Sequence, residues 1–257
     1  MHYYRTGGDG SKPQLVLSHG ATDDGLCWTR VAQALESDFD VIMPDARGHG
    51  LSDAPASGYA SSDHAADLAG LITGLGLSRP AVCGHSMGAG TTLRLVAEHP
   101  ELVRCAILED PGFRTEGAPD LRPNPGAAIR QVVLDSRTAS REEVMARGRQ
   151  SNPGWDESEF GPWADAKARV RDSFLNSMSA RPMLEWRELL PRVEPPLLLI
   201  TSDPERGSIV TPEAALEAQR LLPSLQVVRL QGAGHNVRRE QFDAFIRTVK
   251  EFLAANG

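Results

Sequence analysis

The stretch Pro80-Ala81-Val82-Cys83-Gly84-His85-Ser86-Met87-Gly88 decides the fold of this chain. It begins as a short apolar run typical of a buried strand, and a helical pattern follows from about Met87 to His99. The five residues between strand and helix match G-x-S-x-G, a pattern in which a sharp turn exposes a serine hydroxyl. The sequence therefore predicts that Ser86 is a nucleophile at the carboxyl end of a sheet.

The two glycines and the new helix fit this interpretation. A turn this tight requires residues without a Cβ at Gly84 and Gly88, because side chains there would collide with neighbouring backbone. The first N–H groups of the helix, including that of Met87, are directed at a developing oxyanion. Met87 is therefore a candidate oxyanion donor.

Short apolar runs alternate with helical patterns on both sides of this motif. Strands are expected at 15–17, 39–43, 80–84, 103–108, 197–200 and 226–230, and helices at 26–36, 61–75, 87–99, 213–222 and 239–254. This alternation predicts an α/β fold with a mostly parallel central sheet and helices on both faces. Residues 1–112 and 195–257 are expected to form the core, and 113–194, helical over 141–190, a small cap or lid inserted into it.

Three further motifs carry a family resemblance. They are Ser18-His19-Gly20-Ala21, Asp45-Ala46-Arg47-Gly48-His49-Gly50-Leu51-Ser52-Asp53 and Gly234-His235. With the serine turn, in this order and spacing, the chain resembles the α/β-hydrolase fold family over nearly its whole length, as a serine esterase or lactonase with a helical lid. The resemblance implies an oxyanion hole formed by the backbone N–H groups of Ala21 and Met87.

A serine hydroxyl needs a neighbouring base, and seven histidines compete for that role. His235 is preferred because it follows a short strand and a glycine-rich loop, and because it fits the chain order serine, acid, histidine. His19 and His49 are expected to hold backbone in place, and His85 to point away from the nucleophile. The others are expected at the surface or at helix ends: His2, His64 and His99.

The acid that orients the histidine is less closely defined by the sequence. Asp203 is preferred, because it follows the strand near 197–201, where the family usually places this residue. Glu205 lies two residues further on and stays an alternative. Some relatives take the acid from the end of the preceding core strand, which would be Glu109 or Asp110 here.

The resulting prediction is acyl transfer on a small or medium carboxylic ester or lactone, without a metal or organic cofactor. Trp155, Trp163 and Trp186 in the cap could line an apolar substrate pocket, or could only pack the lid onto the core. A cofactor-free haloperoxidase or a carbon–carbon bond hydrolase would use the same triad. A non-catalytic hydrolase-like binding module is the alternative from another class.

Composition excludes some other functions. The 257 residues carry a net charge of −7, so the surface lacks the positive electrostatic potential that binds the phosphates of nucleic acid. No apolar run reaches the length of a membrane helix, and the N-terminus lacks the apolar segment of a signal peptide, so a cytoplasmic enzyme without a membrane partner is expected. The three cysteines, Cys27, Cys83 and Cys105, are expected to be structural. Monomer and small homo-oligomer both stay open.

Overall fold

A computed structural model describes residues 1–8, 10–114, 125–178 and 183–257. Within them a single sheet has the strand order β1-β3-β2-β4-β5-β6-β7. The strands are β1 (Tyr3–Thr6), β2 (Gln14–Ser18), β3 (Asp40–Pro44), β4 (Ala81–His85), β5 (Ala106–Glu109), β6 (Leu197–Thr201) and β7 (Gln226–Arg229). Strands β2 to β7 run parallel, and β1 pairs antiparallel with β3. The predicted mostly parallel sheet is confirmed, with β1 as an additional edge strand.

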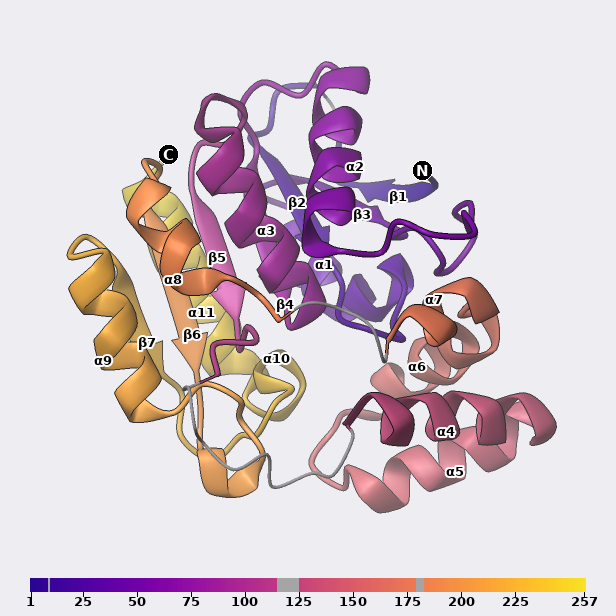
Figure 1. The fold of residues 1–257 in the computed structure, drawn as a ribbon. Coiled ribbons are helices and arrows are strands. Elements are labelled where there is room, and N and C mark those ends of the chain that lie inside the picture. Colours follow the sequence, from indigo (N-terminus) through magenta and orange to yellow (C-terminus); the bar gives the residue numbers. More distant parts are fainter. Residues whose placement is uncertain (9, 115–124, 179–182) are drawn as a thin grey trace.

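Helices cover both faces of the sheet, as predicted (Figure 1). One face packs against α2 (Ser61–Gly74), α3 (Met87–Glu98), α8 (Trp186–Leu189) and α9 (Pro212–Leu221). The other packs against α1 (Thr29–Leu35) and α11 (Phe242–Ala255), with the short α10 (Val237–Glu240) before α11. The apolar strands are buried on both sides, which explains why they contain nearly continuous runs of Leu, Val and Ile. All three cysteines are buried in this packing.

Four helices between β5 and β6 form a separate group at the lower right of Figure 1. They are α4 (Pro125–Thr138), α5 (Arg141–Ser151), α6 (Glu157–Arg169) and α7 (Asp172–Ser177). Helix α4 begins before 141–190, the part of the cap that was expected to be helical, and its first residue is a proline. A proline is tolerated there because the first helical N–H has no partner within the helix.

The ends of the predicted cap pack differently from its middle. Phe113 is buried in the core on the α3 side of the sheet, and so are Trp186, Leu189 and Val193. We therefore propose that the cap proper is shorter than 113–194 and that its described part is 125–178.

The parallel strands bring the motifs to one edge of the sheet. In the register, Ser18 of β2 lies opposite Gly84 of β4, and His85 lies opposite Glu109 of β5. The loops that follow these strands therefore meet at the carboxyl edge, the usual place for a site in an open α/β sheet. No helix in the described part of the chain is both long and apolar enough to cross a membrane.

Candidate active site

Ser86 lies on a strained turn between β4 and α3. Its φ of 52° and ψ of −109° lie in a region that residues with a Cβ rarely adopt. Its N–H donates to the carbonyl of Glu109 (2.9 Å), and its own carbonyl accepts from Gly90 (3.0 Å). Such strain costs about 1–3 kcal/mol and persists only where surrounding contacts enforce it. The turn thus has the geometry of a nucleophile elbow.

The glycines of the motif are required by close backbone contacts. A Cβ on Gly84 would overlap the carbonyl oxygen of Gly88, and a Cβ on Gly88 would overlap the carbonyl oxygen of Ser18. The start of α3 therefore packs directly against the backbone after β2. This packing explains why the sequence has glycine at both positions.

Two backbone N–H groups stay open beside the elbow. Among the described residues, the N–H groups of Ala21 and Met87 donate to no protein acceptor. Both residues are only partly buried and contact one apolar cluster. Free amides of this kind can stabilise a developing oxyanion.

Two histidines hold the loop that carries Ala21, as predicted. His19 Nδ1 donates to the carbonyl of Gly20 (2.8 Å), while its Nε2 accepts from the N–H of Ala46 (2.9 Å). His49 Nε2 accepts from the N–H of Thr22 (3.4 Å). Their ring nitrogens are used in backbone contacts, so neither is available as a base.

His235 pairs with Asp110. Its Nδ1 donates to Asp110 Oδ2 at 2.6 Å, and the carboxylate is fully buried. Asp110 also has a positive φ, 41°, directly after β5. Its remaining acceptor capacity is filled by the Ser208 hydroxyl (2.7 Å) and by the backbone N–H groups of Ile209 (2.8 Å) and Val210 (3.0 Å). The histidine ring is thus held by a rigid, fully hydrogen-bonded carboxylate, which leaves Nε2 for proton transfer.

The preference for Asp203 over Asp110 as the partner of His235 is corrected by this geometry. The Asp203 carboxylate accepts from the Gly232 N–H (2.7 Å) and pairs with Arg229 (2.7 Å). These two contacts, the Gly232 bond first, lower the pKa of Asp203. Glu205 is 71% exposed, and its nearest cation is Arg229. The physical reason lies in the loops that follow the strands. Although β6 lies beside β7, the Asp203 carboxylate is bound to Arg229 and Gly232, whereas Asp110, directly after β5, reaches Nδ1 of His235.

Glu109, the other early candidate, supports the histidine segment in a different way. Its carboxylate accepts from the backbone N–H of Arg238 (2.8 Å) and from the Arg238 guanidinium (3.2 Å). Burial raises the pKa of Glu109, and Arg238 opposes that shift. Glu109 thereby holds the start of α10, just after His235, while its carbonyl holds the N–H of Ser86.

His85 forms a second link between the elbow and His235. Its Nε2 donates to the carbonyl of His235 (2.9 Å), and the two rings lie 4.7 Å apart. Its Nδ1 is buried without a hydrogen-bond partner. Burial, and then the positive charge of Arg238, hold the pKa of His85 well below its usual value. His85 is therefore a neutral donor that fixes the backbone of His235 beside the nucleophile turn, a role that the sequence did not indicate.

A family model described as the alpha/beta hydrolase family matches residues 15–248. The chain belongs to this family. It is 30% identical to the 2-(acetamidomethylene)succinate hydrolase of Mesorhizobium japonicum, over 96% of this chain and 90% of that one. It is also 30% identical to the N-formylmaleamate deformylase of Pseudomonas putida, over 98% and 92%. Its fold is similar to the enol-lactonase of Burkholderia xenovorans, with a TM-score of 0.77 and 26% identity over 98% and 96% of the chains.

The three tryptophans expected near the substrate are engaged in packing in this alpha/beta hydrolase. Trp186 is 2% exposed and stacks on Phe113 at 4.8 Å between ring centroids. Trp155 is buried against Phe160 and beneath the guanidinium of Arg239. Trp163 lies 4.8 Å from the ammonium of Lys167. Of the two alternatives left open by the sequence, the packing of Trp155 and Trp186 favours a structural role, because neighbouring side chains cover both rings.

Other cap residues pack against Ala21 and Met87. One apolar cluster joins Ala21 and Met87 to Leu134 of α4, to Met178 just after α7, and to Tyr59, Val133, Val170, Phe174 and Leu175. Leu134 and Met178 are partly buried. The cluster thus joins residues of the cap helices α4 and α7 to residues of the core.

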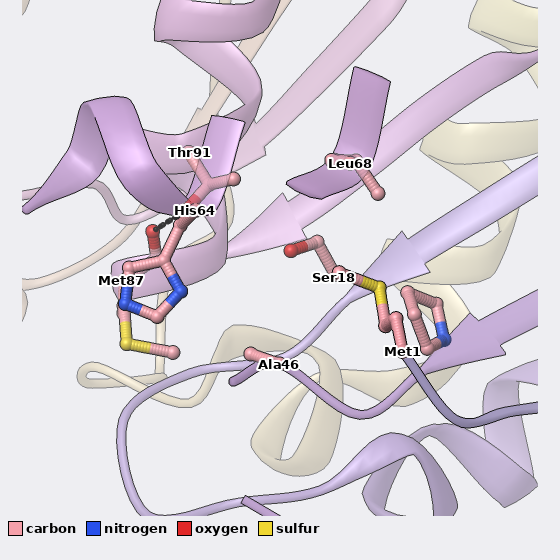
Figure 2. A pocket seen from close by; sticks show the side chains of 8 residues that line it. Met1, Ser18, Ala46, His64, Leu68, Met87 and Thr91 are labelled. Carbon is pink, nitrogen blue, oxygen red and sulfur yellow. Dashed lines mark hydrogen bonds between the residues drawn. The ribbon is translucent and has the colours of Figure 1, made fainter. Parts of the chain in front are cut away.

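A small cavity lies on the far side of Met87, toward α2. It is lined by Met1, Ser18, Pro44, Ala46, His64, Leu68, Met87 and Thr91 (Figure 2). Its volume of about 10 Å³ suits about one water molecule, so it is no substrate site. The Thr91 hydroxyl donates to the carbonyl of Met87 (3.0 Å), a bond drawn in Figure 2 that stabilises the first turn of α3. His64, which was expected at the surface or at a helix end, lies buried in the first turn of α2.

Proposed function

We propose that this alpha/beta hydrolase cleaves a small or medium uncharged carboxylic ester or lactone through Ser86, His235 and Asp110. The observation that carries the proposal is the 2.6 Å bond between His235 and Asp110 at the edge where Ser86 occupies a strained elbow. Nucleophile, base and orienting acid then come from three neighbouring loops at one sheet edge. This constellation is recognised by geometry and roles rather than by position in the sequence.

The mechanism follows from the free atoms of the site. Ser86 Oγ attacks the substrate carbonyl while His235 Nε2 accepts the hydroxyl proton. The carbonyl oxygen becomes negative and is stabilised by the N–H groups of Ala21 and Met87. Asp110 keeps the proton on Nδ1 and stabilises the imidazolium. His235 then protonates the leaving alkoxide, and a water molecule releases the acyl group by the same steps in reverse.

Charge supports an uncharged acyl group. The buried cations nearest the Ala21 loop are already paired: Lys167, Arg238 and Arg239 contact the carboxylates of Asp23, Glu109 and Glu159. The cap residues that pack against Ala21 and Met87 in this cluster, among them Leu134 and Met178, are apolar. Two relatives are named for amide-type substrates that carry carboxylates, so charged and amide substrates belong in the test as competitors. The similarity to an enol-lactonase supports the ester and lactone class.

Active-site labelling tests the proposal. A fluorophosphonate probe with peptide mapping should modify Ser86 in the native protein and nothing in Ser86→Ala. Ser224→Ala, a matched change at an exposed surface position, should label normally. Rates are then compared for p-nitrophenyl butyrate, a p-nitrophenyl hemisuccinate, a γ-lactone and butyryl anilide. We expect p-nitrophenyl butyrate and the γ-lactone to be hydrolysed fastest. Labelling at another residue, or hydrolysis that survives Ser86→Ala, would refute the serine mechanism.

A further inference from the structure

A buried lysine of the cap contacts the loop that carries Ala21. Lys167 lies on α6, is 3% exposed, and is 145 positions away from the loop in sequence. Its ammonium donates to the carbonyl of Thr22 (2.8 Å) and pairs with Asp23 Oδ1 (3.1 Å). An ammonium that is removed from water requires such partners, since burial of an isolated charge is strongly unfavourable.

The segment that Lys167 contacts is a tight turn. The N–H of Asp23 donates to the carbonyl of Gly20 (3.2 Å), so Ala21 and Thr22 are the two central residues. Thr22 has a φ of 65°, an unfavourable value for a β-branched residue. External contacts must therefore hold the turn, and Lys167 holds the peptide group that closes it. Because Ala21 is in the same turn, a shift of this peptide would rotate its N–H.

The carboxylate of Asp23 connects the same lysine to the histidine segment. Asp23 Oδ2 binds the guanidinium groups of Arg238 (3.2 Å) and Arg239 (3.1 Å) on α10. Arg239 in turn pairs with Glu159 of α6 (3.0 Å). Burial alone would raise the pKa of Asp23, but Arg239, Lys167 and Arg238 hold it well below the usual value. The network thus joins cap, oxyanion turn and histidine segment around a carboxylate that stays ionised.

We propose that Lys167 is a positioning residue that sets the orientation of the Ala21 N–H in the oxyanion hole. The packing of the cap helix α6 on the core thereby affects how well the Ala21 N–H stabilises the transition state. The inference rests on the proposed serine hydrolysis. It assigns to a cap residue an effect on the rate of the chemical step, separate from any contact with substrate.

Arg169 offers a matched control on the same helix. Its guanidinium pairs with Asp24 Oδ2 (3.0 Å), so it also joins α6 to the loop after β2. Asp24 lies outside the turn, where its other oxygen accepts from the N–H of Leu26 (3.1 Å). Loss of Arg169 therefore weakens the attachment of the cap without releasing the Ala21 turn.

The experiment compares Lys167→Met, Lys167→Arg and Arg169→Met with the native enzyme. The readouts are kcat and KM for p-nitrophenyl butyrate and the inhibition constant of butylboronic acid, an analogue of the tetrahedral intermediate. Loss of one oxyanion donor costs about 10²–10³-fold in kcat, which sets the upper limit. We expect Lys167→Met to lose roughly 10–100-fold in kcat and a similar factor in boronate affinity, at nearly constant KM. Arg169→Met should stay near native values.

Lys167→Arg keeps a positive charge beside Asp23. It therefore tests the proposal even if Lys167→Met does not fold. A guanidinium cannot reproduce the ammonium position at Thr22, so a smaller loss of kcat at constant KM is expected. Native kcat in the folded Lys167 variants would overturn the proposal, as would equal losses in Lys167→Met and Arg169→Met. Fluorophosphonate labelling of native Ser86 is independent of both results and separates failure of this inference from failure of the serine mechanism.

Discussion

Asp110 Oδ2 accepts a 2.6 Å hydrogen bond from Nδ1 of His235 across 125 positions of sequence. β5 lies beside β4, so Asp110 follows the strand next to the one that carries Ser86, and the loop after β7 brings His235 to the same edge of the sheet. The carboxylate is also fixed by Ser208 and by two backbone N–H groups. A partner this rigid can hold the imidazole in one tautomer, which is the function of the acid in a triad.

Asp110→Asn should therefore lower kcat by about 10⁴-fold while the fold is retained. An amide in place of the carboxylate can donate to Nδ1, which favours the wrong tautomer, and it cannot stabilise the imidazolium. The measurement is steady-state hydrolysis of p-nitrophenyl butyrate. Asp203→Asn is the matched control, and its kcat should stay within about 5-fold of native because Asp203 contacts Arg229 and Gly232. A larger loss of kcat in Asp203→Asn than in Asp110→Asn would show that Asp203 is the acid that orients His235.

The acidic partner of His235 could not be chosen from the sequence alone. Ser86 and His235 could be proposed as nucleophile and base from the sequence because each belongs to a local motif whose glycines constrain a turn. Asp110 and Asp203 both follow a strand of the same sheet, so both satisfied the one-dimensional pattern. Which carboxylate reaches His235 depends on strand order and on the turn after each strand, and a linear pattern does not encode either. The positive φ of Asp110 and the N–H groups of residues 209 and 210 became visible only in the fold.

Other features of the structure were also not predicted, because they depend on packing in three dimensions. Tyr3–Thr6 was missed as a strand because an edge strand is only half-buried and lacks a continuous apolar run. For Trp155 and Trp186 both a pocket and a packing role stayed open, because aromatic content alone does not distinguish a cavity wall from a packed core. The buried charges of Asp23, Lys167 and Arg238 come from three distant segments, so no spacing rule could have joined them.

Gly88→Ala should prevent folding or destabilise the protein by at least about 3 kcal/mol, the scale of a severe steric clash in a packed site. The added methyl group would overlap the carbonyl oxygen of Ser18. Gly90→Ala is the matched control two residues along α3, where the methyl group would meet Leu184 at an ordinary contact distance. That variant should be neutral or up to about 1 kcal/mol more stable, because alanine favours a helix. Urea denaturation measures both, and equal stabilities would contradict the packing described for the elbow.

Leu134→Trp should shorten the acyl chain that the enzyme accepts. Leu134 packs in the cluster that contains Ala21 and Met87, so a larger ring would occupy space near the acyl carbon of a bound ester. We expect the ratio of kcat/KM for p-nitrophenyl hexanoate over acetate to fall by at least about 10-fold, the discrimination typical of a methylene or more in an apolar pocket. Ile129→Trp, an exposed position on the same helix α4, should leave the ratio unchanged. An unchanged ratio in Leu134→Trp would place the acyl site elsewhere.

His85 should make the protein sensitive to acid. Its pKa in the folded state is held well below the usual 6.5 by burial and then by Arg238, whereas the unfolded chain titrates near 6.5. As the pH falls below about 6.5, His85 binds a proton in the unfolded state but stays unprotonated in the native state. The free energy of unfolding then decreases by up to about 1.4 kcal/mol per pH unit until the folded pKa is reached.

His85→Gln should remove this contribution below about pH 6.5, because glutamine does not titrate and its amide can still donate to the carbonyl of His235. The depressed pKa of Asp23 works separately: its stabilisation is present above the unfolded value of 3.8 and is lost as the pH falls through the folded pKa. Both proteins share that loss, so the difference between their slopes isolates His85. Urea unfolding at several pH values gives the slopes, and His99→Gln, at a half-exposed histidine, should keep the native one. If His85→Gln keeps the native slope as well, the neutral-donor role of His85 is wrong.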